Sequence, residues 1–379
     1  MKSEQIVWRP DSGWSPASAM VGQEAQWVLV LGASAALRDA SAMSELRSRY
    51  PHANIVGCST AGEICGTTVC DDTLVATAVH FQHTQIGVAR AVVDDPQSSF
   101  RVGTTLAKDL SAKDGLVHVM VLADGLTVNG TSLAKGLQDH LPPHVAVTGG
   151  LAGDADRFQT TLVCADDLIS DRCVVAIGFY GNRLHIGYGS QGGWDCFGPQ
   201  RLVTRSEGNV LYELDGQSAL ELYKHYLGDH AAALPASALL FPLALSTGSH
   251  DRELVRTVLS IDKAQGSMTF AGDIPQGAHV RSMMANFDRL IDGAAGAAHS
   301  GLQRLDGLKP ELGVLISCVG RKLVLKQRIE EEVESVREVL GPQAVLAGFY
   351  SYGEICPQGE QINCQLHNQT MTITTFAEQ

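Results

Sequence analysis

Residues 57–65 read Gly-Cys-Ser-Thr-Ala-Gly-Glu-Ile-Cys and follow a short apolar run at 53–56. Residues 348–356 read Gly-Phe-Tyr-Ser-Tyr-Gly-Glu-Ile-Cys, so both glycines, the glutamate, the isoleucine and the final cysteine recur at a constant offset. A third stretch, Gly-Gly-Leu-Ala-Gly-Asp at 149–154, reads as a version one residue shorter. Three related turns that end in Gly-Glu or Gly-Asp predict three equivalent points around which the fold is arranged.

The same order of elements precedes each glycine turn. A continuous apolar run, typical of a strand buried on both faces, is followed by a segment with helical spacing and then by a second short strand. The run and the helical segment lie at 27–31 and 41–50, at 116–122 and 132–141, and at 312–316 and 328–340. We therefore predict an α/β protein, a two-domain mixed α/β fold built from repeated strand–helix–strand–glycine-turn units.

Changes in composition suggest where the domains begin and end. Residues 1–24 are polar and contain Pro10, Gly13 and Pro16, which predicts an N-terminal arm. The segment 228–242, with its glycine and prolines, is the best candidate for a boundary between domains. The predicted division is an arm at 1–24, a first domain at 25–228 and a second domain at 229–379.

Charge and cysteine content restrict the class of protein. The 379 residues include 28 basic and 41 acidic side chains, a net charge of −13, which argues against nucleic-acid or anionic-membrane partners. The N-terminus lacks the apolar core of a signal peptide, and none of the nine cysteines forms a Cys-x-x-Cys pair. These features predict a cytoplasmic protein in a reducing compartment.

Several stretches together resemble the FIST proteins, a bacterial sensory family with an N-terminal and a C-terminal FIST domain. The resemblance covers roughly residues 25–375. Besides the turns at 57–63, 149–154 and 348–354, the matching stretches are Leu-Tyr-Glu-Leu-Asp-Gly at 211–216, Phe-Pro-Leu at 241–243, Ser-Cys-Val-Gly-Arg at 317–321 and His-Asn-Gln-Thr at 367–370.

The resemblance implies a cytoplasmic ligand-binding sensor that acts with two-component or cyclic-di-GMP signalling proteins. The family is proposed to bind small ligands such as amino acids. One branch of similar layout consists of nitric-oxide-responsive haem proteins that regulate a partner histidine kinase. A small-molecule ligand and a separate signalling partner are therefore expected.

The residues themselves suggest how such a ligand would be held. Backbone N–H groups of the turns lie at the ends of parallel strands, where open α/β sheets bind ligands. Carboxylates in the turns suit an ammonium or a metal, and Arg321 suits a carboxylate. The expected ligand-binding residues are Cys58, Ser59, Glu63, Gly150, Asp154, Cys318, Arg321, Tyr352 and Glu354. The structural alternative is that the glycines allow close packing and the carboxylates cap the next segment.

A haem or metal site is the second hypothesis. His367 is the first candidate for an axial ligand and His299 the second, although a single histidine also serves as a hydrogen-bonded structural residue. Cys58, Cys65 and Cys70 lie close in sequence and suit a soft metal, or else act as small buried apolar residues. No Cys-x-x-Cys-His sequence is present, so a haem would not be covalently attached.

Catalytic motifs are not found in the sequence. It has no Gly-x-Ser-x-Gly elbow, Walker loop or His-Glu-x-x-His helix. The letters Gly-x-Gly-x-x-Gly occur at 187–192, but a Gly-Trp loop follows where a phosphate-binding helix is needed. We therefore predict a non-enzymatic sensor that binds an amino-acid-like ligand between its domains and signals in trans. An enzyme with Cys58 or Cys318 as nucleophile is the remaining alternative.

Overall fold

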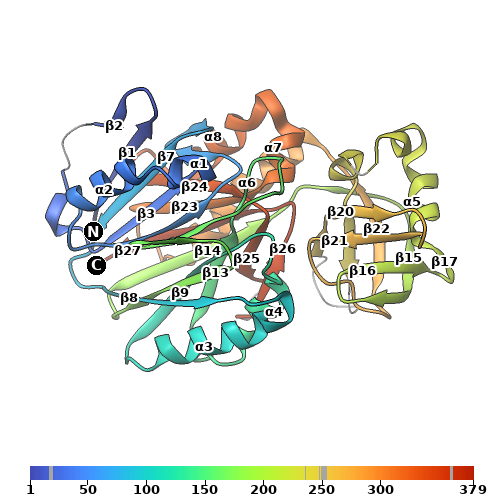
Figure 1. The fold of residues 1–379 in the computed structure, drawn as a ribbon, viewed down its shortest axis with the longest axis horizontal. Coiled ribbons are helices and arrows are strands. Elements are labelled where there is room, and N and C mark those ends of the chain that lie inside the picture. The colour runs from blue at the N-terminus through green and yellow to red at the C-terminus, as the bar shows by residue number, and fades with distance from the viewer. Residues whose placement is uncertain (17–19, 235, 247, 249–253, 359–361) are drawn as a thin grey trace.

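The chain folds into a large body of three β-sheets and a smaller β domain beside it (Figure 1). The structure is a computed structural model that describes residues 1–379 except 17–19, 235, 247, 249–253 and 359–361. The mixed sheets and interspersed helices confirm the predicted α/β class and the repeated strand–helix–strand units. In the described part of the chain, no helix has both the length and the apolar character needed to cross a membrane.

Each sheet of the body is built around one pair of parallel strands. Parallel strands need a crossover connection, and helices supply it in all three repeats. The pairs are β3 (Trp27–Gly32) with β4 (Asn54–Ser59), β9 (Leu116–Ala123) with β10 (Ala146–Leu151), and β23 (Leu312–Cys318) with β24 (Val345–Ser351). The crossover helices are α1 (Ser34–Leu37) and α2 (Ala40–Arg49), α4 (Gly130–Gln138), and α7 (Val319–Leu325) and α8 (Ile329–Leu340).

Two antiparallel strands extend each parallel pair on the same side. One is the last strand of the repeat in sequence, and the other is its first. They are β7 (Leu74–His80) and β1 (Lys2–Arg9), β13 (Cys173–Tyr180) and β8 (Gln85–Val92), and β27 (Met371–Glu378) and β14 (Leu184–Gln191). The expected N-terminal arm thus contributes β1 to the first sheet, in which the buried Ile6 and Trp8 alternate with half-buried residues.

A strand from another repeat completes each sheet. After its glycine turn, every repeat sends one strand into the sheet of a neighbouring repeat, so that the exchange is cyclic. β5 (Glu63–Cys65) pairs with β24, β25 (Gly353–Pro357) pairs with β10, and β11 (Val163–Ala165) pairs with β4. Outer strands are β6 (Thr68–Cys70), β26 (Cys364–His367), β12 (Leu168–Ser170) and β2 (Gly13–Ser15). The three repeats therefore form one interlocked body.

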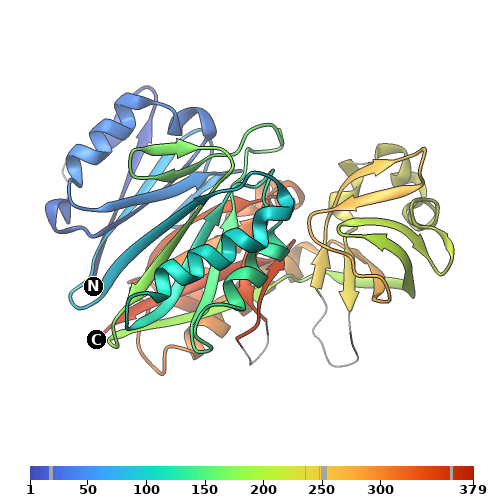
Figure 2. The same ribbon diagram turned by 60° about the horizontal axis from the view of Figure 1, so that its bottom comes forward.

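Aromatic side chains from all three sheets meet at the centre of the body. The ring centroid of Phe179 lies 5.4 Å from that of Trp27 and 5.4 Å from that of Phe376, and those two are 6.1 Å apart. All three side chains are fully buried. Helices α3 (Ser99–Ser111) and α6 (Phe287–Gln303) cover the outer faces, with α3 packed on α4 and α6 on β14 and α8 (Figure 2).

The smaller domain is inserted between β14 and α6. Its sheet has the order β19-β18-β22-β15-β16-β21-β20. The strands are β15 (Asp195–Glu207), β16 (Val210–Leu214), β17 (Gln217–Ser218), β18 (Leu243–Ser246), β19 (Leu254–Arg256), β20 (Val258–Asp262), β21 (Ser267–Phe270) and β22 (His279–Met284), with α5 (Ala219–Leu227) and the 3₁₀ segments η3 (Gly228–Ala233) and η4 (Ala236–Leu240). Residue 228, where the sequence suggests a boundary, lies inside this domain.

Candidate functional site

The first glycine of each turn lets its strand lie against the preceding parallel strand. A Cβ atom at any of these positions would overlap a backbone carbonyl oxygen of the neighbouring strand. The three pairs are Gly57 with Val30, Gly149 with Val121, and Gly348 with Leu315. Only glycine avoids this overlap, so close packing of the strands explains why glycine recurs at this position.

The three turns meet and hydrogen-bond to one another in a ring. In each contact, the backbone N–H four residues after the first glycine of one turn donates to the carbonyl two residues after the first glycine of another turn. The bonds are Ala61 N to Tyr350 O at 2.8 Å, Tyr352 N to Leu151 O at 3.2 Å, and Gly153 N to Ser59 O at 2.9 Å. In this register Asp154 corresponds to Gly62 and Gly353, not to the glutamates that the sequence pattern suggested.

Glu63 and Glu354 are fully buried and held in matching ways. Thr60 Oγ1 donates to Glu63 Oε1 at 2.5 Å, and Thr73 Oγ1 donates to Oε2 at 2.7 Å. Ser351 Oγ donates to Glu354 Oε1 at 2.6 Å, and the Thr370 hydroxyl and amide donate to Oε2. Burial raises the pKa of Glu63 to about 7 and that of Glu354 to about 8, although these donors oppose the shift. These contacts favour a structural role for both carboxylates.

Arg321 already binds a carboxylate of its own chain. Its side chain is completely buried, and Nη2 lies 2.7 Å from Glu332 Oε2. Nη1 donates to Gly192 O and Nη2 to Leu290 O, each at 2.6 Å. Glu332 Oε1 accepts from Tyr350 OH at 2.8 Å. The guanidinium expected to take a ligand carboxylate is therefore engaged within the protein.

The other expected residues of the turns are also enclosed. Ser59 Oγ donates to Gly153 O at 2.8 Å and accepts from Leu162 N at 2.8 Å. A Cβ atom on Gly150 would press on Ile316. Burial raises the pKa of both the Cys58 and the Cys318 thiols well above the usual range, so both stay protonated at neutral pH.

His367 lines a cavity of about 710 Å³ beside β14 and α6. Its Nε2 lies 3.0 Å from Cys356 O, and because a carbonyl oxygen only accepts, Nε2 carries the proton. Burial lowers the imidazole pKa to about 4, which leaves the ring neutral. Among the described residues, no group of three His, Cys, Asp or Glu side chains is placed to hold a metal ion.

Asp154 and Tyr352 together shape a loop that reaches out of the body. Asp154 Oδ1 accepts from Arg157 Nε at 2.9 Å, and Oδ2 accepts from Thr160 N at 3.1 Å. The Tyr352 hydroxyl accepts from Phe158 N and donates to Ala155 O, each at 3.2 Å. Ala155 and Phe158 both have a φ of 51°, a left-handed conformation that these fixed contacts maintain.

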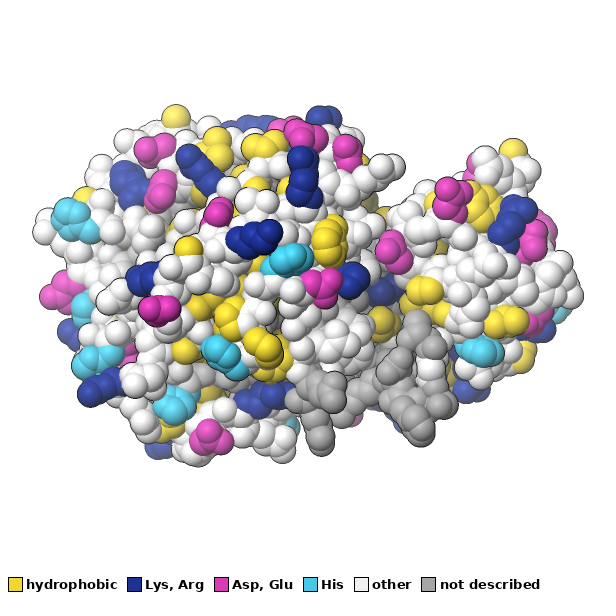
Figure 3. Space-filling model, turned by 90° about the horizontal axis from the view of Figure 1, so that it is seen from below, with side chains coloured by type: hydrophobic (Ala, Val, Ile, Leu, Met, Phe, Trp, Pro, Cys, Tyr) yellow, Lys and Arg dark blue, Asp and Glu magenta, His cyan; other side chains and the backbone are white. Residues whose placement is uncertain are grey.

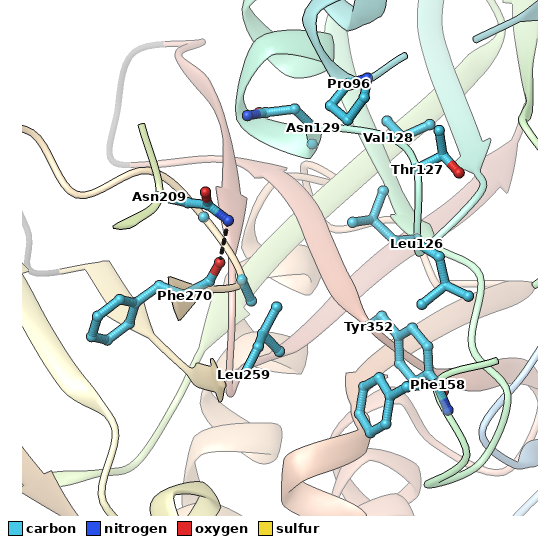
Figure 4. A pocket seen from close by; sticks show the side chains of 15 residues that line it. Pro96, Leu126, Thr127, Val128, Asn129, Phe158, Asn209, Leu259, Phe270 and Tyr352 are labelled. Carbon is cyan, nitrogen blue, oxygen red and sulfur yellow. Dashed lines mark hydrogen bonds between the residues drawn. The ribbon is translucent and has the colours of Figure 1, made fainter. Parts of the chain in front are cut away.

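This loop presents the aromatic ring of Phe158 on the face of Tyr352. The ring centroids are 4.4 Å apart with an interplanar angle of 15°, a stacked arrangement (Figure 4). Phe158 is nonetheless 41% exposed, whereas Tyr352 is 7% exposed. One large apolar ring is thus fixed at the surface of the body and open to a partner molecule.

The Phe158 ring lies in a cleft between the body and the small domain. Two cavities, of about 260 Å³ and about 890 Å³, share Leu126, Phe158 and Leu259 in their walls. Leu126 is 43% exposed and Leu259 is 45% exposed. Leu126 and Phe158 come from the body and Leu259 from β20 of the small domain, as Figure 4 shows. Exposed apolar side chains from both lobes therefore converge on one site.

Two adjacent crossings of the chain connect the lobes. Residues 192–194 lead into β15, and residues 285–286 lead from β22 into α6. Asp195 Oδ2 accepts from Asn286 Nδ2 at 3.1 Å, which ties the two crossings together. Across the lobes, Asn129 Nδ2 donates to Asp273 Oδ1 at 3.2 Å. Figure 3 shows the lobes as two masses with a notch between them, and charges of both signs scattered over that face.

Of the ten residues expected from the sequence, Tyr352 lines this cleft and Asp154 braces the loop beside it. The expectation missed Leu126, Phe158 and Leu259. Phe158 could have been singled out from the sequence, because it is the one large apolar residue in the otherwise small or polar run Asp154 to Gln159. Leu259 carried none, because its exposure follows from the position of the inserted domain.

Fold and cleft define a two-lobed α/β protein with a largely apolar cleft between its lobes. The chain belongs to the FIST family, because the FIST N domain matches residues 26–217 and the FIST C domain matches residues 219–357. FIST domains form a sensory family. The match to both domains confirms the resemblance found in the sequence.

Solved structures give a weaker likeness. A cyanuric acid hydrolase from A. caulinodans is 11% identical, with a TM-score of 0.36 over 100% of this chain and 98% of that one. A second cyanuric acid hydrolase structure is 8% identical, with a TM-score of 0.33 over 100% and 99% of the two chains. Similarity at this level carries no argument about activity. Comparison with curated proteins gave no match.

Proposed function

We propose that this protein is a non-enzymatic sensor that binds a small ligand in the cleft between its lobes. The observation that carries the proposal is the convergence of Leu126, Phe158 and Leu259, each more than two-fifths exposed, on the same two cavities. Fully burying a side chain of this kind contributes about 1.5–3 kcal/mol relative to leaving it in water. A ligand that covers all three side chains therefore contacts both lobes at once.

The position of the cleft gives binding a structural consequence. One wall belongs to the body and the other to a domain held by two short crossings. A ligand that contacts both walls favours the arrangement of the lobes in which both contacts are made. The proposed output is recognition of this arrangement by a separate protein, a histidine kinase or a cyclic-di-GMP signalling partner.

An amino-acid-like ligand with an apolar side chain is the first class to test. Asp156 and Lys326 line the larger cavity, and neither forms an ion pair with a residue that the structure describes. A carboxylate and an ammonium beside an apolar surface complement the charges and the side chain of such a zwitterion. In this proposal they take the part that the sequence assigned to Glu63 and Arg321.

The test is a thermal-shift screen of the intact chain against single amino acids, followed by calorimetry with those that stabilise it. Apolar amino acids should raise the unfolding temperature and polar ones should not. Phe158→Ala should weaken binding at least tenfold, the effect of about 1.4 kcal/mol. Phe100→Ala removes a comparably exposed ring from α3, away from the cleft, and should leave binding unchanged. Equal loss in both variants would contradict the proposed site.

The haem alternative has a poor fit around His367. The cavity beside it is walled by Ser190, Gln191, Gln303 and Gln358, whereas a haem macrocycle needs apolar walls. The His367 ring is also fixed through its bond to Cys356 O. Protein reconstituted with haem should therefore show no Soret band that shifts with nitric oxide. A specific shifted band that His367→Ala abolishes would restore this alternative.

A further inference from the structure

The two cavities of the cleft differ in chemistry although they share three wall residues. The smaller one is lined by Thr127, Asn129 and Asn209 and by backbone at Gly125 and Gly272. No lysine, arginine, aspartate or glutamate is among its described lining residues. It therefore suits a polar group without charge, because a charged group placed there would lose water without gaining a partner of opposite sign.

Two polar groups of the smaller cavity remain available for such a ligand. Asn209 Nδ2 donates to Phe270 O at 2.8 Å, and its Oδ1 has no partner among the described residues. The Thr127 hydroxyl likewise has no described partner. One amide acceptor and one hydroxyl donor complement the N–H and the carbonyl oxygen of an amide.

The larger cavity is apolar along most of its length. Two of its described lining residues, Asp156 and Lys326, are charged, and the others are apolar. The apolar ones come from η3, η4 and the turn between them, from β20 and α7, and from two loops of the body, namely Leu126, Phe158, Ala233, Leu234, Leu239, Leu240, Val258, Leu259, Leu323 and Val324. At about 890 Å³ it lies in the size range of sites for drug-sized ligands, well beyond the side chain of one amino acid.

We infer that the occupant of the proposed cleft is an amphiphile with an uncharged amide head and a linear apolar tail, an N-acyl amide. The head lies in the smaller cavity against Thr127 and Asn209. The tail passes the shared residues Leu126, Phe158 and Leu259 and fills the larger cavity. This inference rests on the proposed function and keeps its cleft, but it replaces the free zwitterion with an uncharged acyl amide that occupies both cavities.

A series of N-acyl glycinamides, measured by calorimetry below their aggregation concentrations, tests the inference. Affinity should rise about fourfold for each added methylene, the equivalent of ~0.8 kcal/mol, and level off once the cavity is full. Leu323→Asn places an amide in the wall of the larger cavity and should flatten this dependence while the shortest member binds as before. Leu202→Asn changes an exposed leucine of β15 outside both cavities and should leave the dependence intact.

The outcomes separate this inference from the proposal on which it rests. If apolar amino acids bind in a Phe158-dependent way but affinity does not grow with chain length, the amphiphile is excluded and the sensor site stands. If the dependence on length survives Leu323→Asn, the tail does not occupy the larger cavity and the inference fails. If neither amino acids nor acyl amides stabilise the protein, both are overturned. Circular dichroism of each variant shows whether it is folded.

Discussion

The side chains of Arg321 and Glu332 form an ion pair that is completely enclosed by protein, with Nη2 and Oε2 2.7 Å apart. Arg321 lies on α7, whose residues Leu323 and Val324 line the larger cavity of the cleft. The same guanidinium holds Gly192 O and Leu290 O, one beside each crossing to the small domain. A single buried side chain thus joins a wall of the cleft to both connections between the lobes.

Removing one partner of this ion pair should be costly. Arg321→Met leaves the Glu332 carboxylate buried without its cation, and the free energy of unfolding should fall by about 3–5 kcal/mol. Urea denaturation measures the loss. The double variant Arg321→Met with Glu332→Leu should be less destabilised than the single one, because no buried charge remains. A double variant that loses the sum of both single effects would show that the two residues act independently.

Glu63 and Glu354 should make the stability depend on pH. Their pKa values in the folded protein, about 7 and about 8, exceed the unfolded value of about 4.5. The folded state therefore holds more protons between these values. The contribution of each carboxyl group to the free energy of unfolding is fully present below pH ~4.5. It is lost as the pH rises through 7 for Glu63 and 8 for Glu354, and the slope is at most about 1.4 kcal/mol per pH unit for each group.

The glutamine variants isolate this effect. Glu63→Gln and Glu354→Gln should each flatten the decline in unfolding free energy between about pH 4.5 and pH 8. Each should also approach or exceed the parent protein in stability at the upper end. Glu334→Gln alters an exposed glutamate of α8 and should reproduce the parent profile. Identical slopes in all four proteins would mean that the buried carboxyls are ionised throughout this range.

The three turn glycines should respond alike to substitution. Gly57→Ala, Gly149→Ala and Gly348→Ala each force a Cβ atom against a carbonyl of the neighbouring strand, so all three should lose at least 2–3 kcal/mol, roughly the cost of overpacking a core. Gly301 of α6 is the control, since a Cβ atom there would make ordinary van der Waals contacts, with the Thr375 side chain at 3.4 Å and Tyr188 N at 3.8 Å. Gly301→Ala should be neutral or stabilising through helix propensity. Chemical denaturation ranks the four variants.

Sequence reasoning reached the repeated units because the turn glycines and buried strands are local features. Gly57 and Gly348 could be recognised by comparing the chain with itself. The cyclic exchange of β5, β25 and β11 could not, since strand partners distant in sequence leave no local signal. Contacts between residues distant in sequence were also invisible when the binding residues were predicted. Glu63 and Arg321 looked like ligand groups by residue type, and only their contacts with Thr73 and Glu332 show that the protein itself uses them.

Cysteine reactivity tests the remaining enzymatic alternative. Cys58 and Cys318 are buried and their raised pKa values keep them as thiols, so neither should react with iodoacetamide in the folded protein. Brief alkylation followed by peptide mass spectrometry should label the half-buried Cys65, Cys70 and Cys196 first. All nine cysteines should react in urea. Rapid modification of Cys58 or Cys318 without unfolding would contradict the enclosed position of these thiols. It would support the alternative that one of them is the nucleophile of an enzyme.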